Sequence, residues 1–178
     1  YCDIPRTIIA VLKDLEWQLH WLHISSTGVF AQNSGEWVHE NTIPAPQTAI
    51  ATVLRASELL VAQHYKKASI LRLGGLYGQG RTHLLQSLKA GRQIQASPWS
   101  YTNRIHRYDA ARAIAFLLER ALDNKTEIAE YYHGVDHDPA PLHQVAQYLV
   151  QLHHLPKPEY FTLHGEQAIA SQNKRVGN

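Results

Sequence analysis

The stretch HISSTGVF, residues 23–30, places three hydroxyl side chains directly after a short apolar run. The run from Trp21 to Ser25 has the length and composition of a buried strand, so Ser25, Ser26 and Thr27 fall where that strand ends. Open α/β enzymes place their chemistry at the carboxyl ends of parallel strands. Hydroxyls at such a point also satisfy free backbone groups in a tight turn. The residues themselves leave both interpretations open, a reactive serine and a strand-end turn.

A glycine-rich stretch, Gly74 to Arg81, follows a second apolar run. Glycines allow a backbone to approach a ligand closely, although a simple tight turn explains them equally well. Arg81 and Arg104 are candidates for binding a phosphate through two hydrogen bonds each. We predict no metal site, because the acidic residues and histidines of the polar segment 136–143 do not have the spacing of a standard site.

Length and composition set further bounds. A chain of 178 residues with 44% hydrophobic residues fits one ordinary domain with a single core. The only cysteine is Cys2, which excludes an intramolecular disulfide framework, and the formal net charge of +2 gives no reason to expect nucleic acid or an anionic membrane as a partner. The sequence contains neither a run of membrane-spanning length nor a signal-peptide pattern, so we expect a cytoplasmic protein.

Helical and strand-like patterns alternate along the chain, which is typical of a parallel α/β sheet. The expected helices cover residues 5–19, 47–65, 83–90, 109–122 and 141–153, and the expected strands cover 21–25, 68–73, 103–106 and 131–135. Asp109 is expected to cap the fourth of these helices. Residues 31–46 are predicted to form a long irregular loop, 74–81 a glycine-rich turn, and 156–178 a poorly patterned polar end.

Six segments, taken in order, resemble the extended short-chain dehydrogenase/reductase superfamily, and within it the NAD-dependent epimerase/dehydratase family. They are ISSTGVF, GEWVHENT, ILRLGGLYGQGR, NRIHRYDAARAIAFLLE, YYHGVDHDPAPLHQVAQYL and KRVGN. The resemblance covers residues 20–178 and implies a Rossmann-like doubly wound parallel sheet, second half only, with a small C-terminal α/β substrate lobe. Residues 1–91 would be the C-terminal half of the nucleotide-binding domain, and 92–178 would mix substrate-lobe and returning segments in the same compact unit. The family's glycine-rich pyrophosphate turn is absent, so we expect a fragment or an incomplete sequence.

The resemblance also implies a site. It places Ser26 beside the nicotinamide of NAD or NADP as the catalytic serine. The residues implied to contact the cofactor are Ser25, Ser26, Thr27, Gly74, Gly75 and Leu76. It assigns Arg81 and Arg104 to substrate phosphates, makes a nucleotide sugar a possible ligand and allows a homodimer.

One feature departs from the family pattern. The YxxxK pair that moves the proton and binds the nicotinamide ribose is replaced by Ile50 and Leu54, counted back from Glu58. Neither side chain can donate a proton, and Arg55 would point about 100° away from the lysine position. Three hypotheses follow: a degenerate NAD(P)-dependent epimerase or dehydratase, a non-catalytic module that binds a dinucleotide or nucleotide sugar, and a fragment without activity of its own.

Overall fold

The computed structural model describes residues 2–12, 20–123, 127–169 and 171–177. Its contacts divide the chain into two compact units, each built from three separate segments. Unit 1 takes in 1–31, 40–74 and 108–134, and unit 2 takes in 32–39, 75–107 and 135–178. The boundary after residue 91 that the sequence suggested stays a prediction.

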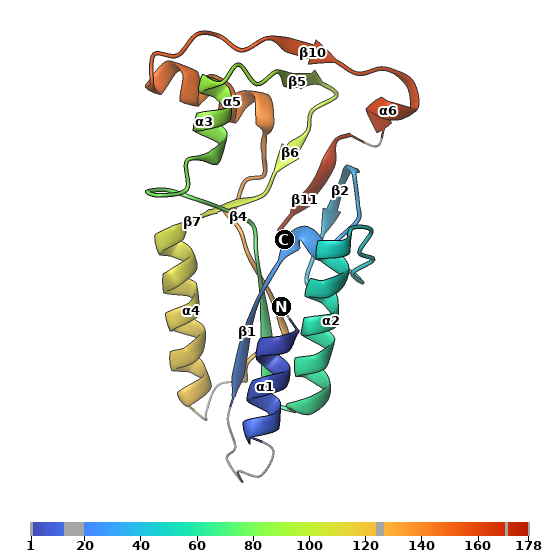
Figure 1. Ribbon diagram of the computed structural model, residues 1–178, viewed down its shortest axis with the longest axis vertical. Coiled ribbons are helices and arrows are strands. Elements are labelled where there is room, and N and C mark those ends of the chain that lie inside the picture. Colours follow the sequence, from blue (N-terminus) through green and yellow to red (C-terminus); the bar gives the residue numbers. More distant parts are fainter. Residues whose placement is uncertain (1, 13–19, 124–126, 170, 178) are drawn as a thin grey trace. The chain divides into compact units, whose positions relative to one another are not determined.

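Unit 1 is a three-stranded parallel sheet with helices on both faces (Figure 1). The strands, in the order β1-β3-β8, are Trp21–Ser26, Ala68–Leu73 and Tyr131–Gly134. The helices are α1 (Asp3–Leu12), α2 (Ala49–His64) and α4 (Arg107–Leu122), with a 3-10 turn, η1, at Thr27–Val29. In Figure 1, α1 and α2 lie on one side of these strands and α4 on the other. This confirms the expected Rossmann-like α/β fold class.

The strand β3 shows why this sheet forms. Five of its six residues are buried, in one continuous run from Ser69 to Leu73. A strand that is buried on both faces is typical of a parallel sheet covered by helices. The helix α2 packs a buried stripe against it, and its N-terminus is capped by Thr48, whose side chain accepts a hydrogen bond from the Ala51 amide at 3.2 Å.

Unit 2 is assembled from short strands in pairs, with helices beside one of them. The parallel pairs are β5 (Ile94–Ser97) with β10 (Tyr160–Thr162), β2 (Ser34–Val38) with β11 (Asn173–Val176), and β4 (Gly75–Tyr77) with β7 (Arg104–His106). An antiparallel pair joins β6 (Tyr101–Thr102) to β9 (Ala140–Pro141), and the helices are α3 (His83–Lys89), α5 (Leu142–Leu152) and α6 (Gly165–Ile169). Its main apolar cluster contains Leu88, Ile94 and Ala146, and Leu84, Leu142, Leu149 and Leu155 pack around them.

Several sequence predictions are corrected here. The segment 31–46 is not entirely a loop, because it contains β2, and the polar end 156–178 contains β10, α6 and β11. The glycine-rich stretch 74–81 contains β4 rather than being only a turn. These strands have at most five residues and pair with partners far along the chain, so local periodicity does not reveal them.

Two of the predicted helices begin two residues earlier in the structure, α4 at Arg107 and α1 at Asp3. Asp109 lies within the first turn of α4 rather than at its cap, because the helix begins at Arg107, and its carboxylate pairs with Arg112 at 3.6 Å. The helix expected over 5–19 is confirmed as far as Leu12, and residues 13–19 lie outside the part of the chain that the structure describes.

Candidate functional site

The carboxyl ends of the three strands of unit 1 meet at one edge of the sheet. Ser26, the last residue of β1, stands opposite Leu73 of β3, and Leu73 stands opposite Gly134 of β8. One residue further, the Gly74 amide donates a hydrogen bond to the Gly134 carbonyl at 2.9 Å. The sheet therefore brings Ser26 and Gly74, both predicted to contact the cofactor, to the same edge.

The turn that follows β1 uses the Ser26 hydroxyl. Ser26 is extended, with φ −137° and ψ 146°, and its Oγ accepts a hydrogen bond from the Gly28 amide at 3.1 Å. Thr27 begins the 3-10 turn and is buried, whereas Ser26 is only half-buried. A hydroxyl has one proton to donate and two lone pairs, so this bond leaves the Ser26 proton and one lone pair for a ligand. Ser26 can therefore stabilise the turn at the strand end and still bind a ligand through its hydroxyl.

Ser25 faces a different environment. It is 6% exposed, and its Oγ donates a 2.6 Å hydrogen bond to Oε1 of Glu58 on α2. Side chains alternate between the two faces of a strand, so Ser25 turns toward α2 while its neighbour Ser26 turns to the opposite face. Of the two serines at this strand end, Ser25 is engaged within the protein.

Glu58 is the centre of a group of four side chains, which we name the Glu58 cluster: Ser25, Arg55, Glu58 and Arg72. Ser25, Glu58 and Arg72 are buried, and Arg55 is partly exposed. Arg72 of β3 donates two hydrogen bonds to the Glu58 carboxylate, from Nε to Oε1 at 3.1 Å and from Nη2 to Oε2 at 2.9 Å. Arg55 adds a third guanidinium contact at 2.9 Å to Oε2. Glu58 is fully buried and Arg72 is 1% exposed, so this is an ion cluster inside the protein rather than at its surface.

The surroundings of Arg72 are aromatic. Its guanidinium lies 4.4 Å from the ring centroid of Tyr131 and 5.1 Å from that of Phe30. Cation–π contacts of this kind are strongest where water is excluded. They compensate part of the cost of burying the charge, together with the bidentate contact to Glu58.

The pKa of the Glu58 carboxyl is lowered from its ordinary value. Burial acts in the opposite direction and is the largest single influence, but the hydrogen bonds from Arg72 and Ser25 together with the charge of Arg72 outweigh it. The pKa of Arg55 is raised, because hydrogen bonds to Glu58 and Tyr131 outweigh its burial. Both shifts favour the charged forms of Glu58 and Arg55 at neutral pH.

The Glu58 cluster was not predicted from the sequence, in which Glu58 served only as the residue from which positions 50 and 54 were counted. A signal was present, since Arg72 is a charged residue within the apolar run SILRL. A charge in the middle of a buried strand requires a partner. The identity of that partner depends on how α2 packs, which the sequence does not state.

A second polar link joins β1 to α2 below the Glu58 cluster. Nε2 of His23 lies 3.2 Å from Oγ of Ser57, which is 1% exposed. The pKa of His23 is lowered, first because burial disfavours the imidazolium, while the nearby Glu58 carboxylate acts in the opposite direction. His23 is therefore held in its neutral form.

This lowered pKa predicts a pH dependence of stability. Between the folded-state pKa and the ordinary value of about 6.5, the unfolded chain binds a proton at His23 that the folded chain does not. The stability that neutral His23 contributes is present above pH 6.5 and is lost as the pH falls. The free energy of unfolding then decreases by at most about 1.4 kcal/mol per pH unit. Urea denaturation at pH 7.5 and pH 5.5 should show that His23→Gln reduces this loss, whereas the exposed His137, changed to glutamine, should not. An unchanged pH profile in His23→Gln would contradict the prediction.

The structure gives Ile50 and Leu54 different surroundings on α2. Ile50, in the first turn, is 69% exposed, and Leu54 is 8% exposed and belongs to the buried face of the helix. Arg55, the cation nearest to the lysine position, is bound to Glu58. Within unit 1, neither position can supply the phenol or the amine that the YxxxK pair would supply.

The remaining predicted residues lie in unit 2. Gly75 and Leu76 form the start of β4 and pair in register with Arg104 and Ile105 of β7, so the structure brings Gly75 and Arg104 together. The Gly75 amide is bonded to the Asn103 carbonyl at 2.8 Å. Gly74, by contrast, belongs to unit 1, so the contact pattern divides the predicted glycine pair between the units.

The two arginines predicted to bind substrate differ in environment. Arg81 is exposed in a turn, where its amide is bonded to the Gly78 carbonyl at 2.9 Å. Arg104 is half-buried, and its Nε is enclosed without a hydrogen-bond partner among the described residues. The pKa of Arg104 is lowered, mainly by burial and next by the charge of Arg92. Arg104 is thus the one of the two with a buried donor to spare.

Charge in unit 2 is concentrated in one segment. Residues 75–107 contain five lysines and arginines and no aspartate or glutamate. Unit 2 also has a buried cation on β11, Lys174, which is 8% exposed and whose pKa is lowered by burial. The sequence analysis did not single out Lys174, because a lysine in a polar terminal segment gives no sign of burial. Such a distribution favours an anionic ligand over a cationic one.

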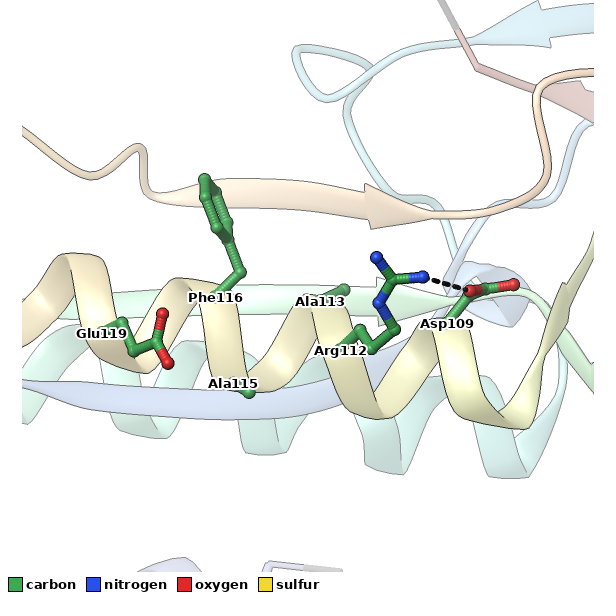
Figure 2. Close-up of a pocket in the computed structure, with 6 residues that line it drawn as sticks. All are labelled: Asp109, Arg112, Ala113, Ala115, Phe116 and Glu119. Carbon is green, nitrogen blue, oxygen red and sulfur yellow. Dashed lines mark ion pairs between the residues drawn. The ribbon is translucent and has the colours of Figure 1, made fainter.

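Two other features of the described residues do not add to the site. No group of three or more histidines, cysteines, aspartates or glutamates in the described ranges is arranged to hold a metal ion. A shallow hollow on α4 is lined by residues of that single helix, where Arg112 pairs with Asp109 (Figure 2). None of the residues that line it is buried, so it has no enclosed polar group with which to orient a ligand.

Among the described residues, no helix has the length and apolarity to cross a membrane.

Comparison with known proteins places the chain in a family. The model of the family described as RmlD substrate binding domain matches residues 10–176. Among curated proteins, none is significantly similar to this chain.

Solved structures share the fold. A putative NAD-dependent epimerase/dehydratase from Methylobacillus flagellatus is 29% identical, with a TM-score of 0.79 over 100% of this chain and 61% of its own. A conserved protein of unknown function from Silicibacter pomeroyi is 27% identical, with a TM-score of 0.76 over 96% of this chain and 63% of its own. A UDP-glucuronic acid 4-epimerase from Bacillus cereus, solved in complex with NAD, is 17% identical and has a TM-score of 0.76 over 98% of this chain and 57% of its own.

The chain thus spans about three fifths of the length of these relatives. Because the family model matches far more than half of the chain, and the fold of unit 1 is that of the relatives, the assignment does not rest on any single motif. The chain belongs to the RmlD substrate binding domain family, within the extended short-chain dehydrogenase/reductase superfamily.

Proposed function

We propose that this protein binds a nicotinamide dinucleotide and an anionic ligand of the nucleotide-sugar type, and that it does so without the proton relay of its family. Support for the first part comes from the strand-end edge of unit 1, where a half-buried hydroxyl and a glycine backbone lie together. Support for the second part comes from the basic segment 75–107, in which the half-buried Arg104 has an enclosed Nε donor.

The observation that carries the proposal is the state of positions 50 and 54. Ile50 is exposed and Leu54 is packed into the buried face of α2, so no phenol and no amine stand one helical turn apart at the start of this helix. Ordinary redox turnover in the family needs a group that exchanges a proton at the substrate oxygen. Binding does not need one, and the strand-end edge is retained.

The residues present suit the nicotinamide end of a dinucleotide. Ser26 keeps a hydroxyl proton free for a hydrogen bond, and a Cβ at Gly28 would meet only the Ser26 side chain, at 3.3 Å, so this turn leaves room for a ligand. The dinucleotide, when bound, supplies a hydride donor or acceptor. In unit 1, Ser26 would hold the nicotinamide end and Gly74 would border it. In unit 2, Arg104 and Arg81 would bind the phosphate groups of an anionic ligand.

The test is to titrate the protein, in its natural length, with NADH and NADPH and to measure turnover with a panel of nucleotide sugars. Tight binding of a dinucleotide without turnover is the expected result. Absence of binding to both dinucleotides would overturn the proposal. Turnover that depends on Ser26 would instead support the active-enzyme alternative.

Replacing Ser26 with alanine is expected to weaken NADH binding about two- to tenfold, which corresponds to the loss of one hydrogen bond. Ser26→Thr keeps the hydroxyl and should bind nearly as well as the wild type. The exposed Thr52 on α2, changed to alanine, serves as a control for loss of a hydroxyl away from the edge. Equal affinity of Ser26→Ala and the wild type, measured by fluorescence titration, would remove Ser26 from the site.

A further inference from the structure

We infer that Ser25 and Glu58 are positioning residues for the dinucleotide site: they fix the end of β1, and through it the Ser26 turn, from inside the protein. The inference rests on the proposed function and extends it to residues that do not touch a ligand.

The geometry connects the end of β1 to both of its neighbours through one carboxylate. Ser25 donates its 2.6 Å hydrogen bond to Oε1 of Glu58, and the same oxygen accepts from Nε of Arg72 at 3.1 Å. Arg72 is also the residue of β3 that stands opposite Ser25 in the sheet. Ser25, one residue before Ser26, is therefore held on one side by its strand pairing with β3 and on the other by the Glu58 carboxylate.

The cluster is also rigid. Glu58 accepts hydrogen bonds from three different side chains, and its other oxygen is held by Nη2 of Arg72 and by Nη1 of Arg55, each at 2.9 Å. Both Glu58 and Arg72 are almost completely buried, and the Arg72 guanidinium lies over the Tyr131 ring. A carboxylate with this many fixed donors has a single orientation, which the Ser25 hydroxyl then shares.

Attachment of β1 to α2 does not by itself explain this cluster. The same strand and helix are already joined by His23 and Ser57, two residues earlier on β1 and one residue earlier on α2. A buried ion cluster is costly to desolvate, and well-packed apolar residues of similar size stabilise a core as well or better. What distinguishes the Ser25–Glu58 contact is its place next to the turn that carries Ser26 and Thr27.

The test compares two buried serines, each of which links β1 to α2 through one side-chain hydrogen bond. Ser25→Ala removes the hydroxyl beside the turn, and Ser57→Ala removes the hydroxyl of the other link between β1 and α2. In the protein of natural length, Ser25→Ala is expected to weaken NADH binding about tenfold, and Ser25→Thr, which restores the hydroxyl, to recover most of it. Ser57→Ala should also lose stability but bind NADH as the wild type does.

A second measurement needs no ligand. Hydrogen exchange of the Thr27 and Gly28 amides should become faster in Ser25→Ala and stay unchanged in Ser57→Ala, because only the first variant loosens the turn. Unchanged exchange and affinity in Ser25→Ala, or equal effects in the two variants, would overturn the inference. If the wild type binds no dinucleotide, the proposed function fails and the positioning of a dinucleotide site fails with it. If hydrogen exchange is then still faster in Ser25→Ala and unchanged in Ser57→Ala, the Ser25–Glu58 contact does hold the turn, and only the proposed ligand is wrong.

Discussion

Replacing Glu58 with alanine is expected to destabilise the protein by about 3–5 kcal/mol, because it leaves a buried guanidinium without its counter-charge. Arg72 is 1% exposed and makes its only ion pair with Glu58 among the described residues. The free energy of unfolding, measured by urea denaturation at pH 7.5, checks this. Glu119 on α4 is exposed and makes a matched control, since Glu119→Ala should change stability by no more than about 0.5 kcal/mol.

A double variant with two apolar side chains distinguishes the cost of leaving a buried charge unpaired from the cost of losing packing contacts. The double variant Glu58→Leu/Arg72→Met removes both charges and keeps most of the volume, so it should recover much of the stability that Glu58→Ala loses. Recovery is expected in stability alone, since the variant lacks the carboxylate that orients Ser25. A Glu58→Ala protein as stable as the wild type would contradict the predicted cost of leaving Arg72 without its counter-charge.

In unit 2, Ile94→Ala is expected to cost about 2–5 kcal/mol. Ile94 on β5 is fully buried at the centre of the cluster with Leu88 and Ala146, so truncation removes apolar contacts and leaves a cavity. Ile43 is 82% exposed and offers the same substitution at the surface, where Ile43→Ala should cost less than about 0.5 kcal/mol. Urea denaturation followed by tryptophan fluorescence checks both variants, and equal midpoints for the two would contradict the assigned core.

Much of unit 1 could be predicted because its strands and helices carry strong local patterns. The apolar run 68–73 and the amphipathic stretch 47–65 correspond to β3 and α2 with differences of at most two residues at each end. Unit 2 was predicted less well, since β2, β10 and β11 are short and pair across long stretches of chain. Short strands of this kind are defined by their partners rather than by their own periodicity.

The sequence by itself determined the fold class, the strand that carries Ser26 and the replacement of the YxxxK pair by Ile50 and Leu54, because each depends on residue order and local spacing. Only the tertiary structure decided which serine faces α2 and which is left for a ligand. It also revealed that Arg72 and Glu58, 14 residues apart, form a buried ion pair and that Ser25 donates a hydrogen bond to the same carboxylate. Side-chain partners across a strand and a helix depend on register and packing, and no local pattern in the chain encodes either of them.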